Sequence, residues 1–597
     1  MRDRPNLVPF LRRAAAQVVL GWLLVGRVLA AVAPSTEVPV AAIHASGAAA
    51  QQVFVVRGGV TRVGGDGFFL QQPNAASDPP AADAIFVRTG RRPPLNPGDC
   101  VRVRGRVAIV DGDGPATPPM RTLRAIDRVQ VVHGACAIVP LELDLPAVDP
   151  GRFEGRLVHL RGPWMVQRNA SLARFGELTI ATAGRVEVPT NRLRPGPAAQ
   201  ALARANARRS VVLDDGDDRQ DPSPPPFLGA DGTVRAGDTL PAITGIVVRA
   251  RLPAGPGGWR ILPAQESVRF ARANPRPAAP PVVGGSLRVA SVNVDNFFAT
   301  IADGVARCGP RRDPADCRGA HGRAEFERQR AKLVAALLAL DADVLALMEI
   351  ENDGDRTLQS LVDALDAGAR AGVYAGLPEP PDGSGSDAIK VAMIYKPARV
   401  LAVGAARGDA AAIHGRRPIA QTFAQVASDG GAGRRFNLVA VHLKSRRCQD
   451  ATGAEADQGD LQGCWSRRRL LQARAVREFA QRVAAASGTA DTLVVGDFNA
   501  YAQEDALLEL SDHGFADQAA RLDPGGYTFA FDGAAGRLDQ VFASASLAPR
   551  VTGVAEWHIN ADEPTLLDAA HVGARGAVTP YRASDHDPVL IGLELAR

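Results

Sequence analysis

Residues 35–140 follow a short, strand-like hydrophobic pattern. Runs of Val, Ile, Phe and Leu alternate with Gly and Pro turns, and helical periodicity is nearly absent. The runs predict strands at residues 52–56, 67–70, 84–87 and 100–107, with NPGD forming the turn before the last strand. Such short strands predict an all-β domain, either a small barrel or a sandwich.

A second β-rich region follows at residues 141–270. Its hydrophobic runs predict strands at 156–160, 177–180 and 244–248. The region ends at a Pro-rich segment, residues 271–286, which contains NPRPAAPPVVGG and predicts a linker between domains. Since a chain of 597 residues is too long for one hydrophobic core, several domains are expected.

The pattern changes after the linker, where strands alternate with helices. Residues 287–294 and 343–348 are apolar runs of strand length, and 493–495 is the centre of another. Residues 323–340 and 466–486 repeat apolar side chains at helical spacing. We therefore expect a multidomain protein in which an all-β N-terminal part precedes a C-terminal α/β domain at residues 287–597.

The first 33 residues have the pattern of a secretory signal peptide. An Arg-rich start precedes an apolar run at 14–26 that only Gln17 interrupts, and Ala31-Val32-Ala33 offers a cleavage site. The alternative is a membrane anchor, which Gln17 and Arg27 disfavour. We expect secretion to the periplasm or the medium, with no stable membrane association after cleavage.

Charge does not by itself indicate a binding partner. Residues 1–33 contain five arginines and one aspartate, so their removal lowers the formal net charge from +5 to +1. Only local clusters of basic side chains, rather than the overall charge, can therefore indicate nucleic-acid binding.

The six cysteines form three groups of near neighbours in the sequence. A secretory signal and this clustering favour local disulfides in an oxidising compartment. A metal site is disfavoured, because the chain has no C-x-x-C pair or Cys/His cluster. The expected pairs are Cys100–Cys136, Cys308–Cys317 and Cys448–Cys464.

Polar residues of a few types lie at the ends of apolar strands in the C-terminal half. One such residue has many structural explanations, but six placements in one domain indicate a functional site, because strand ends on a rigid sheet hold side chains precisely. The placements are Asn293 in LRVASVNVDNFF, Glu349 in DADVLALMEIEN, His442 in FNLVAVHLKS, Asp497 and Asn499 in DTLVVGDFNA, Asp539 in GRLDQVFAS, and Asp585, His586 and Asp587 in YRASDHDPVLIGL.

The chemistry of this set indicates a hard metal ion and proton transfer. Carboxylate and amide oxygens suit Mg²⁺ best, with Mn²⁺ or Ca²⁺ as alternatives, and they do not favour zinc. Histidines transfer protons or donate hydrogen bonds to phosphate near neutral pH. No G-x-S-x-G, Walker loop or H-E-x-x-H is present, which disfavours serine hydrolases, nucleotide-driven enzymes and zincins.

In their order along the chain, these motifs resemble the endonuclease/exonuclease/phosphatase superfamily. EFERQRAKLVAAL, LMEIEND, GSDAIKVAMIYKP, VHLKS and GCWSRRRLLQAR are similar to its secreted bacterial nucleases. In the first half, GGVTRVGGDGFFLQQ and PGDCVRVRGRV resemble the OB-like domain that precedes the catalytic domain in some of those nucleases. The resemblance implies a four-layer α/β sandwich whose active site lies where the two sheets open.

The resemblance also implies a metal site. By matched position, Glu349 would bind the essential divalent metal, with Asn293 beside it and Asp585 as a further ligand. Arg417, in GRRPIAQTF, matches an arginine that contacts the substrate phosphate, although a surface charge before a strand explains it equally well.

Roles in proton transfer follow from the same matched positions. Asp497 would orient or deprotonate the attacking water, and Asn499 would position that water or the phosphate. His586 would pair with Asp539, and His442 would contact the scissile phosphate. Asp387 is a looser match to the carboxylate that orients His442.

We therefore expect a secreted, metal-dependent phosphodiesterase, and more specifically an extracellular deoxyribonuclease, with RNA as the alternative polymer. A phosphodiesterase of the same fold that acts on lipid or small phosphoesters is one competing interpretation, although no membrane-insertion hairpin rich in aromatic residues is evident. A non-catalytic nucleic-acid-binding surface protein is the other, and it would have no use for the full set of metal and histidine positions.

Overall fold

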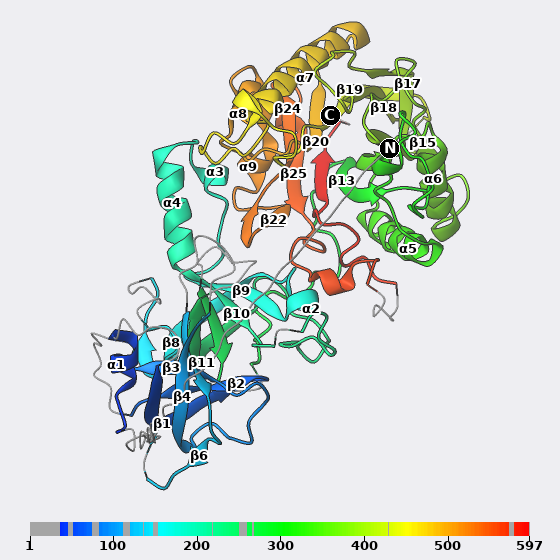
Figure 1. The fold of residues 1–597 in the computed structure, drawn as a ribbon. Helices are drawn as coiled ribbons and strands as arrows, with labels where there is room; N and C mark the ends of the chain where they lie inside the picture. The colour runs from blue at the N-terminus through cyan, green and yellow to red at the C-terminus, as the bar shows by residue number, and fades with distance from the viewer. Residues whose placement is uncertain are drawn as a thin grey trace, which may run out of the picture.

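The computed structural model describes residues 36–45, 52–73, 83–110, 120–134, 136–146, 153–217, 219–249, 259–264, 268–427, 429–571 and 578–595. The expected signal peptide at residues 1–33 lies outside them. Strand-rich parts occupy the N-terminal end of the molecule, and most of the helices belong to the C-terminal part (Figure 1). Among the described helices, none combines the length and the apolar character needed to cross a membrane.

The first β domain is a closed barrel. Its strands follow the order β1-β2-β3-β5-β4, and β4 pairs again with β1 to close the sheet. The β3 and β5 strands run parallel, and Phe68, Leu70, Val101 and Leu123 are buried inside. Its elements are α1 (Val40–Ala45), β1 (Val53–Val63), β2 (Gly67–Gln71), β3 (Ala84–Arg88), β4 (Cys100–Val110), β5 (Met120–Ala125) and β6 (Gln130–Val131).

The second β-rich region repeats this connectivity. Its closed order is β8-β9-β10-β12-β11, with β11 pairing back to β8 and with β10 and β12 parallel. The elements are β7 (Leu141–Leu143), β8 (Leu157–Arg168), α2 (Leu172–Phe175), β9 (Glu177–Thr182), α3 (Pro189–Arg192), α4 (Pro197–Arg208), β10 (Ser210–Asp214), β11 (Thr239–Arg249) and β12 (Trp259–Pro263).

The C-terminal domain contains two six-stranded sheets, ordered β15-β16-β14-β13-β26-β25 and β17-β18-β19-β20-β24-β21, with the hairpin β22-β23 beside them. The strands are β13 (Leu287–Phe297), β14 (Val344–Glu351), β15 (Ala375–Gly376), β16 (Ile389–Tyr395), β17 (Val400–Gly408), β18 (Ile419–Val426), β19 (Ala432–His442), β20 (Thr492–Asp497), β21 (Phe515–Asp517), β22 (Phe529–Phe531), β23 (Ala534–Gly536), β24 (Asp539–Ser544), β25 (Val551–Glu556) and β26 (Val589–Leu593). The helices are α5 (Arg323–Leu340), α6 (Arg356–Gly368), α7 (Ser466–Ser487), α8 (Asp505–Ser511) and α9 (Gln518–Leu522).

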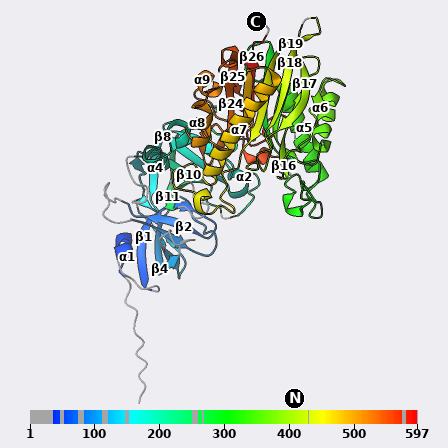
Figure 2. The same cartoon turned by 90° about the horizontal axis from the view of Figure 1, so that it is seen from above.

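The two sheets face each other across a shared apolar core, to which β13 contributes Val289 and β19 contributes Leu438. Helices α5 and α6 pack on the outer face of the first sheet, and α7 and α8 pack on the outer face of the second. Figure 2 shows the two pairs of helices on opposite sides of the strands. Because both faces of each sheet are covered, its central strands contain buried apolar runs, such as residues 344–348 of β14.

The Pro-rich segment at 271–286 is packed against both neighbouring domains rather than free. Ala271 pairs with Thr239 of the second barrel, and the Arg276 guanidinium forms an ion pair with Glu563 of the C-terminal domain. Val283 is buried in the core beneath α5 and α6. The segment therefore joins the domains as a fixed connection rather than as a spacer.

Buried charges join the second barrel to the C-terminal domain. Arg235, with a side chain 2% exposed, lies 2.8 Å from a Glu563 oxygen and donates to the His558 carbonyl. Asp562 pairs with Arg185 at 3.0 Å and accepts a hydrogen bond from Tyr527 at 2.7 Å. Burial alone would raise the pKa of Asp562, but Arg185, His558 and Arg235 hold it below its usual value.

This interface predicts a large loss of stability when Arg235 is replaced. Arg235→Ala leaves Glu563 buried without one of its cations, and removal of one partner from a buried ion pair costs about 3 kcal/mol or more in the free energy of unfolding. We expect a lower urea midpoint, followed through the fluorescence of buried Trp557. Arg204→Ala, an exposed substitution on α4, should change the free energy by less than about 0.5 kcal/mol. Equal midpoints for the two variants would contradict the predicted role of the interface.

All three expected disulfides are present: Cys100–Cys136, Cys308–Cys317 and Cys448–Cys464. The first joins the start of β4 to the segment after β6, the second closes the long connection between β13 and α5, and the third holds the segment before α7. The described residues contain no free cysteine.

Candidate active site

The sequence-predicted residues meet at one end of the two facing sheets. Strands β13 and β14 run parallel in one sheet, and β19 and β20 run parallel in the other. Parallel strands present the same ends to the same edge, which brings Asn293 and Glu349 to the edge that faces His442 and Asp497. Asp539 begins β24 directly opposite Asp497, and His586 precedes β26.

Four side chains form the centre of the site. The Asn293 amide donates to Glu349 at 3.1 Å and to Asp497 at 3.3 Å. His442 Nε2 lies 3.4 Å from an Asp497 oxygen and 3.9 Å from a Glu349 oxygen. Ligand atoms of Glu349, His442 and Asp497 all lie within 4.8 Å of one another. The Glu349 side chain is 18% exposed whereas the other two are 2% exposed, so the centre is open to solvent on the Glu349 side.

An irregularity in the pairing of β13 with β14 aims two carboxylates at this centre. The register shifts between Asn293 and Phe297, so that three residues of β13 lie opposite Glu349 alone. Glu349 has φ 71° and Asp295 has φ 49°, a left-handed conformation that non-glycine residues adopt only where the surrounding structure imposes it. A bulge of this kind redirects side chains at the end of a sheet.

Asp295 belongs to this site, and the sequence analysis missed it. Burial, together with the charges of Asp585 and Glu349, raises the pKa of Asp295. Burial and Asp585 likewise raise the pKa of Glu349. The Asp295 backbone N–H donates to Asn293 Oδ1, and the N–H of the next residue, Asn296, donates to Glu349 Oε2, both at 3.0 Å. The missed signal was the spacing in NVD, which places a second polar side chain two residues after Asn293.

His586 and Asp539 form a buried pair. His586 Nδ1 lies 2.7 Å from Asp539 Oδ2. Burial lowers the pKa of His586, but the charges of Asp539, Asp497 and Asp585 outweigh it and hold that pKa well above the ordinary value. The Phe529 ring packs 4.6 Å from the imidazole. The buried Asp539 carboxylate therefore favours the protonated imidazole of His586.

Asp587 has a structural role in the same loop. Its carboxylate accepts hydrogen bonds from the backbone of Asn560 and Ala561 and lies 2.9 Å from His558 Nδ1. The Asn560 side chain donates to the His586 carbonyl at 2.6 Å. His558 also stacks on Tyr527, with ring centroids 4.1 Å apart. The interface with the second barrel thus supports the loop that carries His586.

Asn499 holds Asp497 in place. Its backbone N–H donates to Asp497 Oδ1 at 2.8 Å, and its side-chain amide donates to Asp497 Oδ2 and to the Leu443 carbonyl, both at 3.2 Å. Burial, opposed by His586, raises the pKa of Asp497. A role for Asn499 in positioning water or phosphate stays a prediction.

The arginine beside His442 is Arg416, not Arg417. Arg416 Nη1 lies 2.7 Å from His442 Nε2, whereas Arg417 donates to the Asp382 carbonyl away from this centre. Burial and the Arg416 charge lower the pKa of His442 well below its ordinary value, which favours the neutral imidazole. The sequence contains two adjacent arginines, and only the direction of the turn decides which one enters the site.

Asp387 faces Arg416 and Arg318, and its expected role in orienting His442 stays a prediction. Asp387 lies 3.8 Å from Arg416 Nε and 3.2 Å from Arg318 Nη2. Arg416 occupies the space between this carboxylate and the imidazole. Asp387 therefore pairs with two guanidinium groups at the edge of the site.

The donor set fits a hard divalent cation. Asp295, Glu349, Asp497 and Asp585 supply carboxylate oxygens, which Mg²⁺, Mn²⁺ and Ca²⁺ prefer. Burial, together with neighbouring negative charge, raises the pKa of Asp295, Glu349 and Asp497, and a cation among them would relieve this repulsion. Two sets of possible ligands share Glu349. One set adds His442 and Asp497, and the other adds Asp295 and Asp585.

Solved structures that are similar to part of this chain are distant in sequence. The human Nocturnin catalytic domain with bound sulfate is 18% identical, covering 52% of this chain and 95% of that one at a TM-score of 0.31. An endonuclease/exonuclease/phosphatase from Bacteroides vulgatus is 14% identical, covering 52% and 98% at 0.33. A mannosyl-6-phosphatase from Bacteroides thetaiotaomicron is 16% identical, covering 51% and 99% at 0.31.

No curated protein sequence matches the chain significantly. Residues 290–586, which extend from just before Asn293 to His586, match the model of the Endonuclease/Exonuclease/phosphatase family. Members of this family are usually hydrolases that act on phosphoesters. The C-terminal domain of this chain is therefore of the Endonuclease/Exonuclease/phosphatase type.

Proposed function

We propose that this protein is a secreted, metal-dependent nuclease that hydrolyses phosphodiester bonds of DNA. The observation that carries the proposal is the convergence of Glu349, Asp497 and the His586–Asp539 pair at one partly open site. A metal-binding carboxylate, a second carboxylate able to orient water, and a cationic imidazole are the groups that metal-assisted phosphodiester hydrolysis requires.

Each group has a distinct role in this mechanism. Glu349, with Asn293, Asp295 and Asp585, would hold the divalent metal, and when bound that metal would supply positive charge opposite the phosphate and its leaving oxygen. Asp497, fixed by Asn499 and Asn293, orients the attacking water and accepts its proton. His586 donates a hydrogen bond to a phosphate oxygen through Nε2, because Asp539 occupies Nδ1.

The N-terminal part supports a polymeric substrate. Both β domains close into barrels with one parallel pair of strands, which supports the proposal of OB-like domains, a fold whose members bind oligonucleotides and oligosaccharides. In the first barrel Arg102, Arg104 and Arg106 alternate along β4 and point away from the core. We propose that the barrels hold nucleic acid beside the C-terminal site.

Secretion rests on two further observations. The three disulfides fit an oxidising compartment, and the N-terminal pattern at 1–33 fits an export signal. The periplasm and the medium both satisfy these observations.

Incubation of the purified protein with several substrates tests the proposed function. We expect cleavage of supercoiled and linear DNA with Mg²⁺ or Mn²⁺, and loss of cleavage with chelator. RNA, bis(4-nitrophenyl) phosphate and sphingomyelin vesicles are the comparison substrates. Faster turnover of vesicles than of DNA would favour the lipid phosphodiesterase, and DNA binding without cleavage under any metal would favour the binding protein.

A further inference from the structure

One segment of the second barrel pairs with the hairpin β22-β23 of the C-terminal domain. It comprises residues 185–191, which lie between β9 and α4, and is called the docking segment below. Val188 N–H donates to the Ala535 carbonyl of β23, and Ala535 N–H donates to the Val186 carbonyl, both at 2.9 Å. The two chains run parallel at this point. Backbone hydrogen bonds from another domain therefore hold the hairpin.

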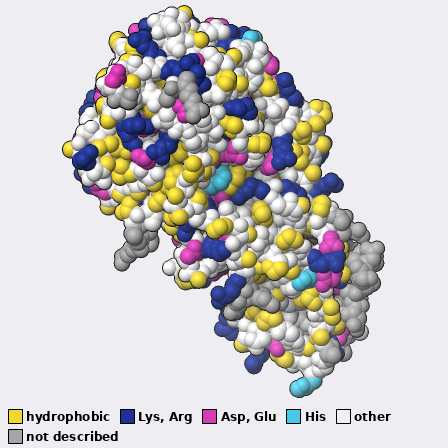
Figure 3. All heavy atoms as spheres, turned by 180° about the vertical axis from the view of Figure 1, so that it is seen from behind, with side chains coloured by type: hydrophobic (Ala, Val, Ile, Leu, Met, Phe, Trp, Pro, Cys, Tyr) yellow, Lys and Arg dark blue, Asp and Glu magenta, His cyan; other side chains and the backbone are white. Residues whose placement is uncertain are grey.

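The docking segment also packs closely on β23 and the residues that follow it. A methyl group on Gly536 would lie 3.3 Å from Val188 Cβ and 2.5 Å from the Tyr501 ring. The Asn191 side chain accepts a hydrogen bond from Arg537 N–H at 3.3 Å. Figure 3 shows the N-terminal and C-terminal parts of the molecule in contact, with acidic and basic side chains gathered where they meet. Little space is left in which the hairpin could shift relative to the segment.

The second barrel holds the docking segment from the other side. Gln167, which is 2% exposed, accepts a hydrogen bond from Val186 N–H at 2.8 Å and donates to the Gly184 carbonyl at 3.1 Å. Asn206 of α4 donates to the Glu187 carbonyl at 3.0 Å. The segment is therefore fixed to its own barrel as well as to the hairpin.

The hairpin in turn holds the His586–Asp539 pair. The Phe529 ring of β22 packs 4.6 Å from the His586 imidazole. Thr528 Oγ1 accepts a hydrogen bond from Asp539 N–H at 3.2 Å, and the Thr528 carbonyl accepts one from Asp587 N–H at 2.8 Å. Because β22 and β23 pair residue by residue, a movement of β23 would also move these contacts.

A second set of contacts from the docking segment reaches the Asp497 side of the centre. Thr190 Oγ1 donates to Glu504 at 2.8 Å, and both residues are buried. Arg446 pairs with Glu504 at 2.7 Å and donates to the Asn499 carbonyl at 3.4 Å. Asn499 is the residue that holds Asp497. The segment therefore has contacts that lead to both sides of the catalytic centre.

We propose that the docking segment is a positioning element of the catalytic centre, which sets the place of the His586–Asp539 pair through the hairpin β22-β23. The inference rests on the proposed phosphodiester hydrolysis and adds that the second barrel contributes to the chemical step. A misplacement of about 1 Å in a catalytic group can lower the rate about 100-fold, even when the substituted residue lies far from the chemistry.

The test is Val188→Pro in the full chain. Val188 has φ −61°, which proline adopts without strain, so the substitution removes the N–H donor at a compatible backbone position. With bis(4-nitrophenyl) phosphate, which ends at the scissile phosphate, kcat should fall about 10-fold or more while KM changes less than about 2-fold. The Mg²⁺ concentration at half-maximal rate should stay the same, because no proposed metal ligand is altered. Circular dichroism verifies that the variant folds.

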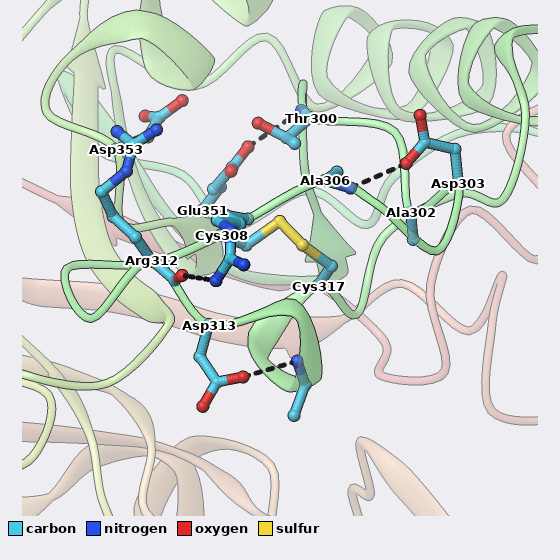
Figure 4. The surroundings of a disulfide bond; sticks show 12 residues. Thr300, Ala302, Asp303, Ala306, Cys308, Arg312, Asp313, Cys317, Glu351 and Asp353 are labelled. Carbon is cyan, nitrogen blue, oxygen red and sulfur yellow. Dashed lines mark hydrogen bonds between the residues drawn. A yellow bond between two sulfur atoms is a disulfide. The ribbon is translucent and has the colours of Figure 1, made fainter.

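Ala306→Pro is the matched control. It also removes one N–H donor, which Ala306 offers to Asp303 at 2.8 Å in the loop that the Cys308–Cys317 disulfide closes (Figure 4). This loop connects β13 to α5 rather than joining the hairpin, and kcat should stay within about 2-fold of the wild type. Val188→Ala removes the side chain but keeps the N–H, so it should lower kcat less than Val188→Pro does.

Two variants of Asn191 test the same contact surface without a proline. Asn191→Ala removes the acceptor for Arg537 N–H, and kcat should fall about 3-fold, the scale of one net hydrogen bond. Asn191→Asp keeps an acceptor oxygen and should recover most of this loss. Combining Val188→Pro with Phe529→Leu tests the route, since two changes that act through one ring should lower kcat by less than the product of their separate effects.

The Cε1–H resonance of His586 gives a readout that does not depend on activity. It can be assigned in protein labelled with ¹³C-histidine by its loss in His586→Ala. Because the Phe529 ring lies 4.6 Å from the imidazole, a displaced ring changes this chemical shift. We expect the resonance to move in Val188→Pro and to stay in place in Ala306→Pro.

Three results would overturn the inference. Wild-type kcat together with an unmoved His586 resonance in Val188→Pro would show that the segment does not position the pair. A raised KM with unchanged kcat would assign the segment to substrate binding instead. Fully independent effects of Val188→Pro and Phe529→Leu would exclude the route through the hairpin. If the wild type hydrolyses neither polynucleotide nor the small diester, the proposed function fails, and the His586 resonance alone decides whether the segment positions the imidazole.

Discussion

Replacement of His586 with alanine is expected to lower the rate of phosphodiester cleavage at least 100-fold, the usual scale for a lost general acid–base group or transition-state hydrogen bond. The reason is geometric. Asp539 occupies Nδ1 at 2.7 Å, the Asn560 side chain holds the His586 carbonyl, and Nε2 is left for the phosphate. No other described side chain duplicates this buried imidazole–carboxylate pair at the centre, since burial and Arg416 favour the neutral imidazole of His442.

Excess metal should not restore the His586→Ala enzyme, because the lost group acts on the phosphate rather than on the cation. Cleavage rate measured against Mg²⁺ concentration checks this, with circular dichroism to confirm that the variant folds. Asp539→Asn keeps the size of the side chain but weakens its hold on the imidazole, so we expect a smaller fall in kcat with little change in KM. A His586→Ala protein that cleaves DNA at the wild-type rate would show that the site is wrongly assigned at its centre.

Replacement of Glu349 with glutamine should impair cleavage in a different way. The substitution keeps the size of the side chain and removes a charge from the carboxylate that is shared by both ligand groupings. We expect cleavage to fall at least 10-fold at low Mg²⁺ and to recover in part as Mg²⁺ or Mn²⁺ is raised, since loss of a ligand weakens the cation site without removing the groups that act on water and phosphate.

Glu351→Gln is the matched control for this variant. Glu351 lies on the same strand two residues further along, is 1% exposed, and accepts hydrogen bonds from Thr300 and Thr357 rather than facing the centre. Its replacement should lower stability while leaving the metal concentration at half-maximal rate unchanged. Identical metal dependence for Glu349→Gln and the wild type would rule out Glu349 as a ligand.

Secondary structure in the C-terminal domain was predictable because local pattern and burial agree there. The helix expected at 323–340 is α5 (Arg323–Leu340), whose Phe326, Leu333 and Leu337 are buried as their spacing predicts. The strands expected at 287–294 and 343–348 are β13 and β14, lengthened by a few residues. Strands buried on both faces have continuous apolar runs, which make a strong signal.

The sequence analysis did not predict helix α4, because its local sequence pattern does not indicate a buried helix. It lies in a region that reads as β-rich, and its sequence PAAQALARANAR has no stripe of large apolar residues. Only Ala199 and Asn206 of this helix are buried. A helix held by small contacts and by the Pro at its start leaves little hydrophobic periodicity for a sequence analysis to detect.

The sequence by itself determined which residue types meet at the site, because each ends an apolar strand and parallel strands end at a common edge. Only the tertiary structure decided how the side chains of these residues are oriented. The bulge opposite Glu349 brought Asp295 to the centre, and the turn at 416–417 directed Arg416 toward His442 and Arg417 toward the Asp382 carbonyl. It also decided that the second barrel supports the His586 loop through Asp562 and Tyr527. Periodicity along a chain specifies which face a residue occupies, whereas bulges, turns and contacts between domains depend on residues hundreds of positions apart.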